Sequence, residues 1–157
     1  MTKGKIDMHK EVVILLAEDD EGHAGLIRKN LTRGHILNEL LHFKDGQEIL
    51  DFLFQKGAGP HRQSGASYVL LLDIRMPKID GTEVLVQVKT DPELRKIPVI
   101  MITTTDDPRE VERCHAMGCN NYITKPVDYD KFVNSIRQLG LFLSIVEVPR
   151  INGEGVG

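Results

Sequence analysis

The sequence predicts a single α/β domain built around a parallel β-sheet, and three observations lead to this prediction. Several short apolar runs, such as residues 69–72, lack polar alternation, which is typical of strands buried on both faces. Amphipathic segments separate these runs, so strands and helices alternate along the chain, an order that favours right-handed crossovers. The length of 157 residues is enough for one domain with its own hydrophobic core.

Strands are predicted where apolar and β-branched residues run together between turn-forming residues. The central run leads directly into Asp73, and Pro77 follows four positions later, where it prevents the strand from continuing. Taken alone, an aspartate at such a place is usually only a turn residue. The expected strands comprise residues 12–17, 36–43, 69–72, 98–103 and 121–124.

Helices are predicted where apolar residues recur at helical spacing between a capping residue and a helix-ending residue. Asp20 and Asp128 suit the N-caps of the first and last helices, and Pro108 suits a first helical turn. Gly34 and Gly118 favour helix ends. The expected helices comprise residues 20–34, 49–54, 81–90, 108–118 and 128–139, with a turn or short helix at Asp91-Pro92.

The domain is expected to span residues 12–140, with a flexible leader at 1–11 and an extension at 141–157. The leader is polar and lacks the apolar core of a signal peptide. The extension begins with an apolar run and ends in a glycine-rich tail too short for an output domain. This run either packs back on its own domain or contributes to a homodimer interface, and we favour the homodimer.

Composition excludes several classes of function. The net charge of −3 provides no basic field for nucleic acid, and no apolar run is long enough to span a membrane. Cys114 and Cys119 lack the paired spacing of a zinc site and imply reduced thiols, so we expect a cytoplasmic protein. Four histidines do not recur at metal-ligand spacing and are predicted to be surface or packing residues: His23, His35, His42 and His115.

The residues that follow the predicted strands carry the chemistry. In a parallel sheet the carboxyl ends of the strands meet at one edge, where ligands bind. Several carboxylates, a hydroxyl and an ammonium would gather there, from Glu18-Asp19-Asp20, Asp73, Thr103 and Lys125. Carboxylates this close repel one another, and a hard divalent cation such as Mg²⁺ relieves the repulsion because it prefers oxygen ligands. The plain alternative is a set of solvated acids at strand ends.

These residues resemble the receiver domain of two-component response regulators, in particular small receivers paired with phytochrome-type and other sensor histidine kinases. The resemblance covers about residues 11–139 and implies a flavodoxin-like doubly wound sheet in the order 2-1-3-4-5, with helices on both faces. It rests on five separated parts in the right order: Glu18-Asp19-Asp20, Asp73-Ile74-Arg75-Met76-Pro77, Gly81, Thr103 and Lys125-Pro126.

The resemblance implies that Asp73 accepts a phosphoryl group from a sensor histidine kinase or a phosphotransfer protein. A carboxylate is a competent acceptor, and the transfer depends mainly on positioning and charge neutralisation. The protein would be no enzyme beyond its own phosphotransfer and dephosphorylation, and it would signal through contacts with a downstream protein. The expected cofactor is Mg²⁺, with these implied ligands: Glu18, Asp19, Asp73 and the backbone carbonyl of Arg75.

Further roles are implied beside the acceptor. Lys125 and Thr103 would contact the phosphoryl group, and Thr104, bulkier than the residue usual there, would narrow access to it. Thr103 and Tyr122 would form a switch that changes the face used for signalling, although an aromatic in a short strand is often only packing. The resemblance also implies a cis peptide between Lys125 and Pro126, where the sequence alone favours trans.

Two other functions remain open at this level. A phosphatase that forms an aspartyl phosphate typically needs a second aspartate two positions after the nucleophile, where this chain has Arg75. A phosphorylation-independent adaptor of the same fold would leave Asp73 unmodified. The complete acidic set and Lys125 argue against the adaptor.

Overall fold

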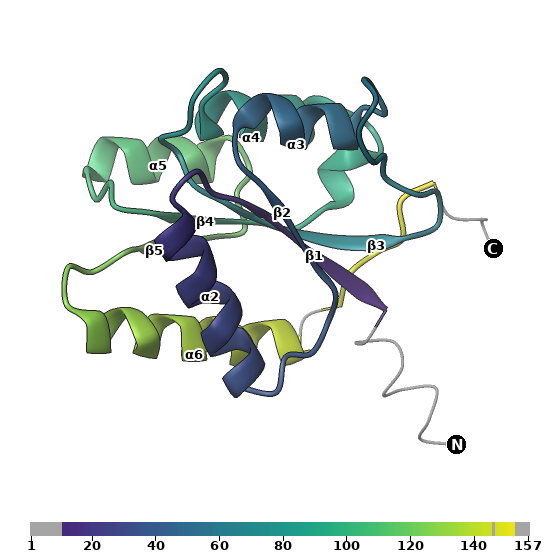
Figure 1. Cartoon of the computed structure of the whole chain (residues 1–157). Coiled ribbons are helices and arrows are strands. Elements are labelled where there is room, and N and C mark those ends of the chain that lie inside the picture. Colours follow the sequence, from purple (N-terminus) through teal and green to yellow (C-terminus); the bar gives the residue numbers. More distant parts are fainter. Residues whose placement is uncertain (1–10, 146, 153–157) are drawn as a thin grey trace.

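A computed structural model describes residues 11–145 and 147–152, which form a three-layer α/β domain. A five-stranded sheet lies in the middle, with its strands, numbered along the chain, in the order 2-1-3-4-5. Helices α3 (Gly46–Leu53), α4 (Gly81–Thr90) and α5 (Pro108–Ala116) cover one face of this sheet, and α2 (Glu21–Arg33) and α6 (Tyr129–Ile145) cover the other (Figure 1). The predicted fold class and strand order are confirmed. The leader lies almost wholly outside the described residues, as does the end of the tail.

All neighbouring strands pair in parallel. The central strand is buried along its whole length because helices cover both of its faces. Its side chains alternate between two cores: Leu70 and Leu72 face one helical layer, and Val69 and Leu71 face the other. The strands are β1 (Val12–Ala17), β2 (Leu40–Phe43), β3 (Ser67–Leu72), β4 (Val99–Thr103) and β5 (Asn121–Thr124).

The edge strand β2 is shorter than predicted. Residues 36–43 were expected to be extended, but pairing with β1 begins only at Leu40. The backbone N–H groups of His35 and Ile36 still donate to carbonyls of the preceding helix, at Thr32 and Leu31. The start of the predicted strand is therefore used to close that helix rather than to extend the sheet.

Four helices begin after an aspartate; the sequence pattern indicated this cap for the first of them, at Asp20, whereas α3 begins at Gly46 and not at the expected residue 49. The side chains of Asp20, Asp45, Asp80 and Asp107 each accept a hydrogen bond from a backbone N–H of the first turn. The helices are α2 (Glu21–Arg33), α3 (Gly46–Leu53), α4 (Gly81–Thr90), α5 (Pro108–Ala116) and α6 (Tyr129–Ile145), with a 3₁₀ turn, η1 (Leu94–Lys96). Within the described residues, no helix combines the length and apolar character needed to cross a bilayer.

Helix α6 is longer than predicted, because it continues through Gly140 to Ile145 instead of ending near residue 139. A glycine ends a helix when it adopts a left-handed conformation, and Gly140 does not do so. Phe142 and Leu143 are half-buried against the core between α6 and α2. Burial of these side chains favours the additional turn of helix.

The segment 147–152 returns along the amino-terminal edge of the sheet toward the opposite helical layer (Figure 1). Ile151 is fully buried in the core beneath α3 and α4. Its N–H donates to the carbonyl of Ala66 at 2.9 Å, and its carbonyl accepts from the N–H of Gly65 at 2.7 Å. The described part of the extension thus packs on its own domain, whereas Leu141 remains 65% exposed.

The peptide between Lys125 and Pro126 is trans, because the described residues contain no cis peptide bond. The cis form implied by the family resemblance is therefore wrong for this structure. Trans is the lower-energy isomer before proline by about 0.5–1 kcal/mol.

Candidate functional site

The site lies at the carboxyl ends of β1, β3 and β5. The register pairs Ala17 of β1 with Leu72 of β3, so the residues that follow them, Glu18 and Asp73, leave the sheet at the same level. The N–H of Asp73 donates to the Ala17 carbonyl at 3.0 Å. After the neighbouring strands β4 and β5, the N–H of Lys125 donates to the Thr103 carbonyl at 2.7 Å. These backbone bonds extend the ladder by one residue and fix where the three charged side chains begin.

The three side chains meet in a buried cluster. The Lys125 Nζ lies 2.5 Å from Glu18 Oε1 and 3.1 Å from Asp73 Oδ2. Glu18, Asp73 and Lys125 are each less than a tenth exposed. Because hydrogen bonds between charged groups are strong in such a setting, the ammonium holds both carboxylates in place. One positive charge faces two carboxylates, so the ionised cluster carries an excess of negative charge.

Burial raises the pKa of the Glu18 carboxyl to about 7. The hydrogen bond from Lys125 opposes this rise, and the negative charge of Asp73 adds to it. A second cation at this place would favour the ionised carboxylate.

Asp19 supplies a third carboxylate, and it is exposed where Glu18 is buried. One oxygen from each of Glu18, Asp19 and Asp73 lies within 4.8 Å of the others. An all-oxygen donor set of this kind fits a hard divalent cation such as Mg²⁺. Arg75 follows Asp73 by two residues, and the role predicted for its backbone carbonyl remains a prediction.

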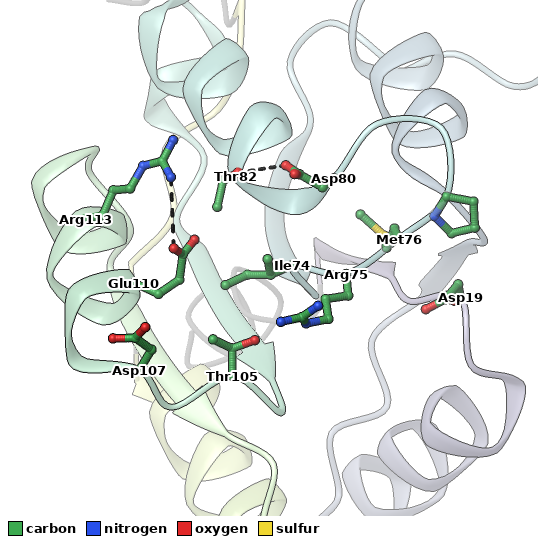
Figure 2. Close-up of a pocket in the computed structure, with 11 residues that line it drawn as sticks. Asp19, Ile74, Arg75, Met76, Asp80, Thr82, Thr105, Asp107, Glu110 and Arg113 are labelled. Carbon is green, nitrogen blue, oxygen red and sulfur yellow. Dashed lines mark hydrogen bonds and ion pairs between the residues drawn. The ribbon is translucent and has the colours of Figure 1, made fainter.

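A cavity of about 750 Å³ opens beside this cluster, between the loops that follow β3 and β4. Figure 2 shows the Arg75 side chain extending into the cavity, with Asp19 on one side and Asp107 and Glu110 on the other. Among the described residues, the Arg75 guanidinium has no hydrogen-bond or ion-pair partner. A small molecule in this cavity would reach Asp19, the exposed member of the acidic set.

The two predicted switch residues lie close to the loop after β4. Thr103 is fully buried, and its hydroxyl oxygen accepts from the N–H of Thr105 at 3.4 Å. Tyr122 is half-buried, and its hydroxyl donates to the Thr105 carbonyl at 2.6 Å. Burial raises the pKa of the Tyr122 hydroxyl to about 12, so it remains a donor at neutral pH. Thr104 is exposed.

His23 is the site residue that the sequence prediction missed. Its Nδ1 lies 3.0 Å from Lys125 Nζ, and its ring packs edge-on against Phe132 with centroids 6.0 Å apart. The prediction of a surface or packing residue was therefore incomplete. The available signal was local: His23 stands in the first turn of the helix that Asp20 caps directly after the acidic pair.

The family model for the response regulator receiver domain matches residues 14–137. A crystal structure of a receiver domain from Rhodospirillum rubrum shares 45% sequence identity with this chain. The alignment covers 90% of this chain and 99% of that domain, with a TM-score of 0.84.

Two relatives carry further information. Response regulator Rcp1 of Synechocystis is 36% identical over 138 residues, which are 87% of this chain and 92% of Rcp1. Its Mn²⁺-bound crystal structure matches 87% of this chain and 98% of that chain, with 31% identity and a TM-score of 0.78. The phosphorylated cyanobacterial phytochrome response regulator RcpA matches 85% of this chain and 94% of its own, with 28% identity and a TM-score of 0.74. This chain belongs to the response regulator receiver domain family of two-component signalling.

Proposed function

We propose that Asp73 is the phosphoryl acceptor of this receiver, and that the protein signals in the cytoplasm by protein–protein contacts. The observation that carries this proposal is the meeting of Asp73, Glu18 and Lys125 at one strand edge, with Asp19 completing a set of three carboxylates. The phosphoryl donor is a histidine kinase or a phosphotransfer protein. The relationship to the phosphorylated RcpA supports this assignment.

The phosphoryl transfer requires little covalent chemistry from the protein. An oxygen of the Asp73 carboxylate attacks phosphorus, and the new O–P bond forms as the P–N bond to the donor histidine breaks. The electron pair of the broken bond stays on the imidazole nitrogen. Lys125 neutralises the charge of the phosphoryl oxygens, and the cluster fixes the attacking carboxylate in advance.

Mg²⁺ is the proposed cofactor, which the Mn²⁺-bound structure of Rcp1 and the all-oxygen donor set support. When bound, it would neutralise negative charge on the acceptor and on the phosphoryl group. Its proposed ligands are Glu18, Asp19, Asp73 and the backbone carbonyl of Arg75.

The signal would be transmitted by a movement of the loop that follows β4. The Thr103 hydroxyl donates to the phosphoryl group on Asp73, which draws this loop toward the site. Because the Tyr122 hydroxyl is bound to Thr105 of the same loop, the movement reaches β5 and the face formed with α5 and α6. A downstream protein reads this face. The exposed Leu141 at the end of α6 supports a share of this helix in a homodimer contact.

The test is incubation with acetyl phosphate and Mg²⁺, followed by intact-mass measurement. The wild-type protein is expected to gain one phosphoryl group and Asp73→Asn none, because an amide oxygen is a poor nucleophile. Asp106→Asn, which removes an exposed acid of the loop after β4, is the matched control and is expected to label like the wild type.

Labelling of Asp73→Asn at the wild-type level would contradict the assignment. Multiple turnover of a generic phosphomonoester would instead favour the phosphatase alternative. A wild-type protein that stays unmodified would favour the adaptor.

A further inference from the structure

The Lys125 ammonium uses all of its donors within the protein. An ammonium carries three N–H groups and no acceptor. Its three partners are Glu18 Oε1 at 2.5 Å, His23 Nδ1 at 3.0 Å and Asp73 Oδ2 at 3.1 Å. A phosphoryl oxygen that arrives on Asp73 therefore finds every donor of Lys125 already engaged.

The contact with His23 is a hydrogen bond in which Lys125 is the donor. An ammonium can only donate, so Nδ1 of His23 is the acceptor in this contact. The ring is held in this orientation by Phe132 and by its place in the first turn of α2.

The three partners differ in how easily they release the ammonium. Glu18 and Asp73 are buried and their carboxylates make charge-assisted bonds. His23 offers a neutral nitrogen, and its side chain is 40% exposed, so water can replace Lys125 as its partner. The bond to His23 is the one that costs least to exchange.

We propose that His23 is a positioning residue for Lys125, which holds the third N–H in the free protein and releases it to the phosphoryl group. This inference rests on the proposed function of Asp73 as the acceptor. His23 thus acts through Lys125 and sets part of the free-energy cost of phosphorylation. Removing its acceptor leaves that N–H bound to water, which the phosphoryl group displaces more easily.

The test is the affinity for beryllium fluoride, a mimic of the phosphoryl group on aspartate, measured by ¹⁹F NMR with Mg²⁺ present. His23→Phe keeps a ring beside Phe132 but has no acceptor, and it is expected to bind about fivefold more tightly, the effect of one net hydrogen bond. His23→Asn places an amide oxygen near the position of Nδ1 and is expected to return the affinity to about the wild-type value.

A second readout follows the ring itself. In the wild type, the ¹⁵N resonance of His23 Nδ1 is expected to move when beryllium fluoride is added, because its donor leaves. Equal or weaker binding by His23→Phe, or an unmoved resonance, would overturn the role of His23. Wild-type protein that binds no beryllium fluoride would overturn the proposed function, and this inference with it.

Discussion

At the scale of single residues, the site contains two buried carboxylates but only one ammonium. Lys125 is the ammonium between two buried carboxylates, and burial, to which the negative charge of Asp73 adds, raises the pKa of Glu18. The excess negative charge of this cluster favours binding of a further cation beside Lys125.

The raised pKa of Glu18 predicts how stability depends on pH without divalent cations. Between pH 4.5 and about 7 the folded state binds the Glu18 proton more tightly than the unfolded state does. The free energy of unfolding should therefore fall as pH rises through this window, by about 3 kcal/mol from this group.

Urea unfolding of wild type and Glu18→Gln at several pH values checks this prediction. The difference between the two proteins should change across the window, in the direction that makes the variant relatively more stable at pH 8 than at pH 5. A difference that stays constant would show that Glu18 keeps an ordinary pKa.

Sequence reasoning reached most of the residues of the site, and its one clear omission is instructive. Glu18, Asp73 and Lys125 could be predicted because each directly follows a strand, and strand ends in a parallel sheet meet at one edge. His23 lies on a helix, where its direction depends on the helix axis and on packing against Phe132. The sequence places His23 close to the acidic pair, in the first turn of that helix, but it does not give the direction of the side chain.

At the scale of elements, helix α6 shows how burial overrides a local signal. The last helix was expected to end at residue 139, before Gly140, yet side chains beyond this glycine are half-buried against the α2 layer. A glycine within a helix makes the helix less stable than an alanine would, so a substitution at this position can stabilise the protein.

Gly140→Ala is expected to stabilise the protein by about 0.5–1 kcal/mol, the usual gain for alanine over glycine in a helix. An added Cβ would lie 3.5 Å from Ile36 and 3.9 Å from Leu31, which is ordinary contact. Thermal unfolding measures the gain.

Gly81→Ala is the contrasting control, because its Cβ would overlap the backbone carbonyl of Asp73. This variant is expected to be destabilised. A loss of stability in Gly140→Ala would mean that α2 and α6 pack more closely than described.

At the scale of the whole molecule, the segment 147–152 joins the two helical layers. It leaves α6 on one face and places Ile151 in the core of the other, with Ser67 and Glu93 as further partners. A homodimer contact through this extension would therefore have to form while the segment 147–152 stays packed on its own chain.

Ile151→Ala should lower the free energy of unfolding by about 2 kcal/mol, the low end of the range for truncation of a buried isoleucine. Urea unfolding and hydrogen exchange at the Gly65 amide, which donates to Ile151, measure the effect. Arg150→Ala, which removes only an exposed ion pair with Glu11, is the control and should change stability little. An effect of Ile151→Ala as small as that expected of Arg150→Ala would show that the segment contributes little to the stability of the fold.

The sequence alone determined the fold class, the strand order through the family resemblance, and the acids and lysine at the strand ends. These features follow from the period of the apolar pattern and from the geometry of parallel sheets. Only the tertiary structure decided that His23 takes the third N–H of Lys125, that α6 passes through Gly140, and that Ile151 returns to the opposite core. Each of these depends on packing between segments distant along the chain, which local propensity does not encode.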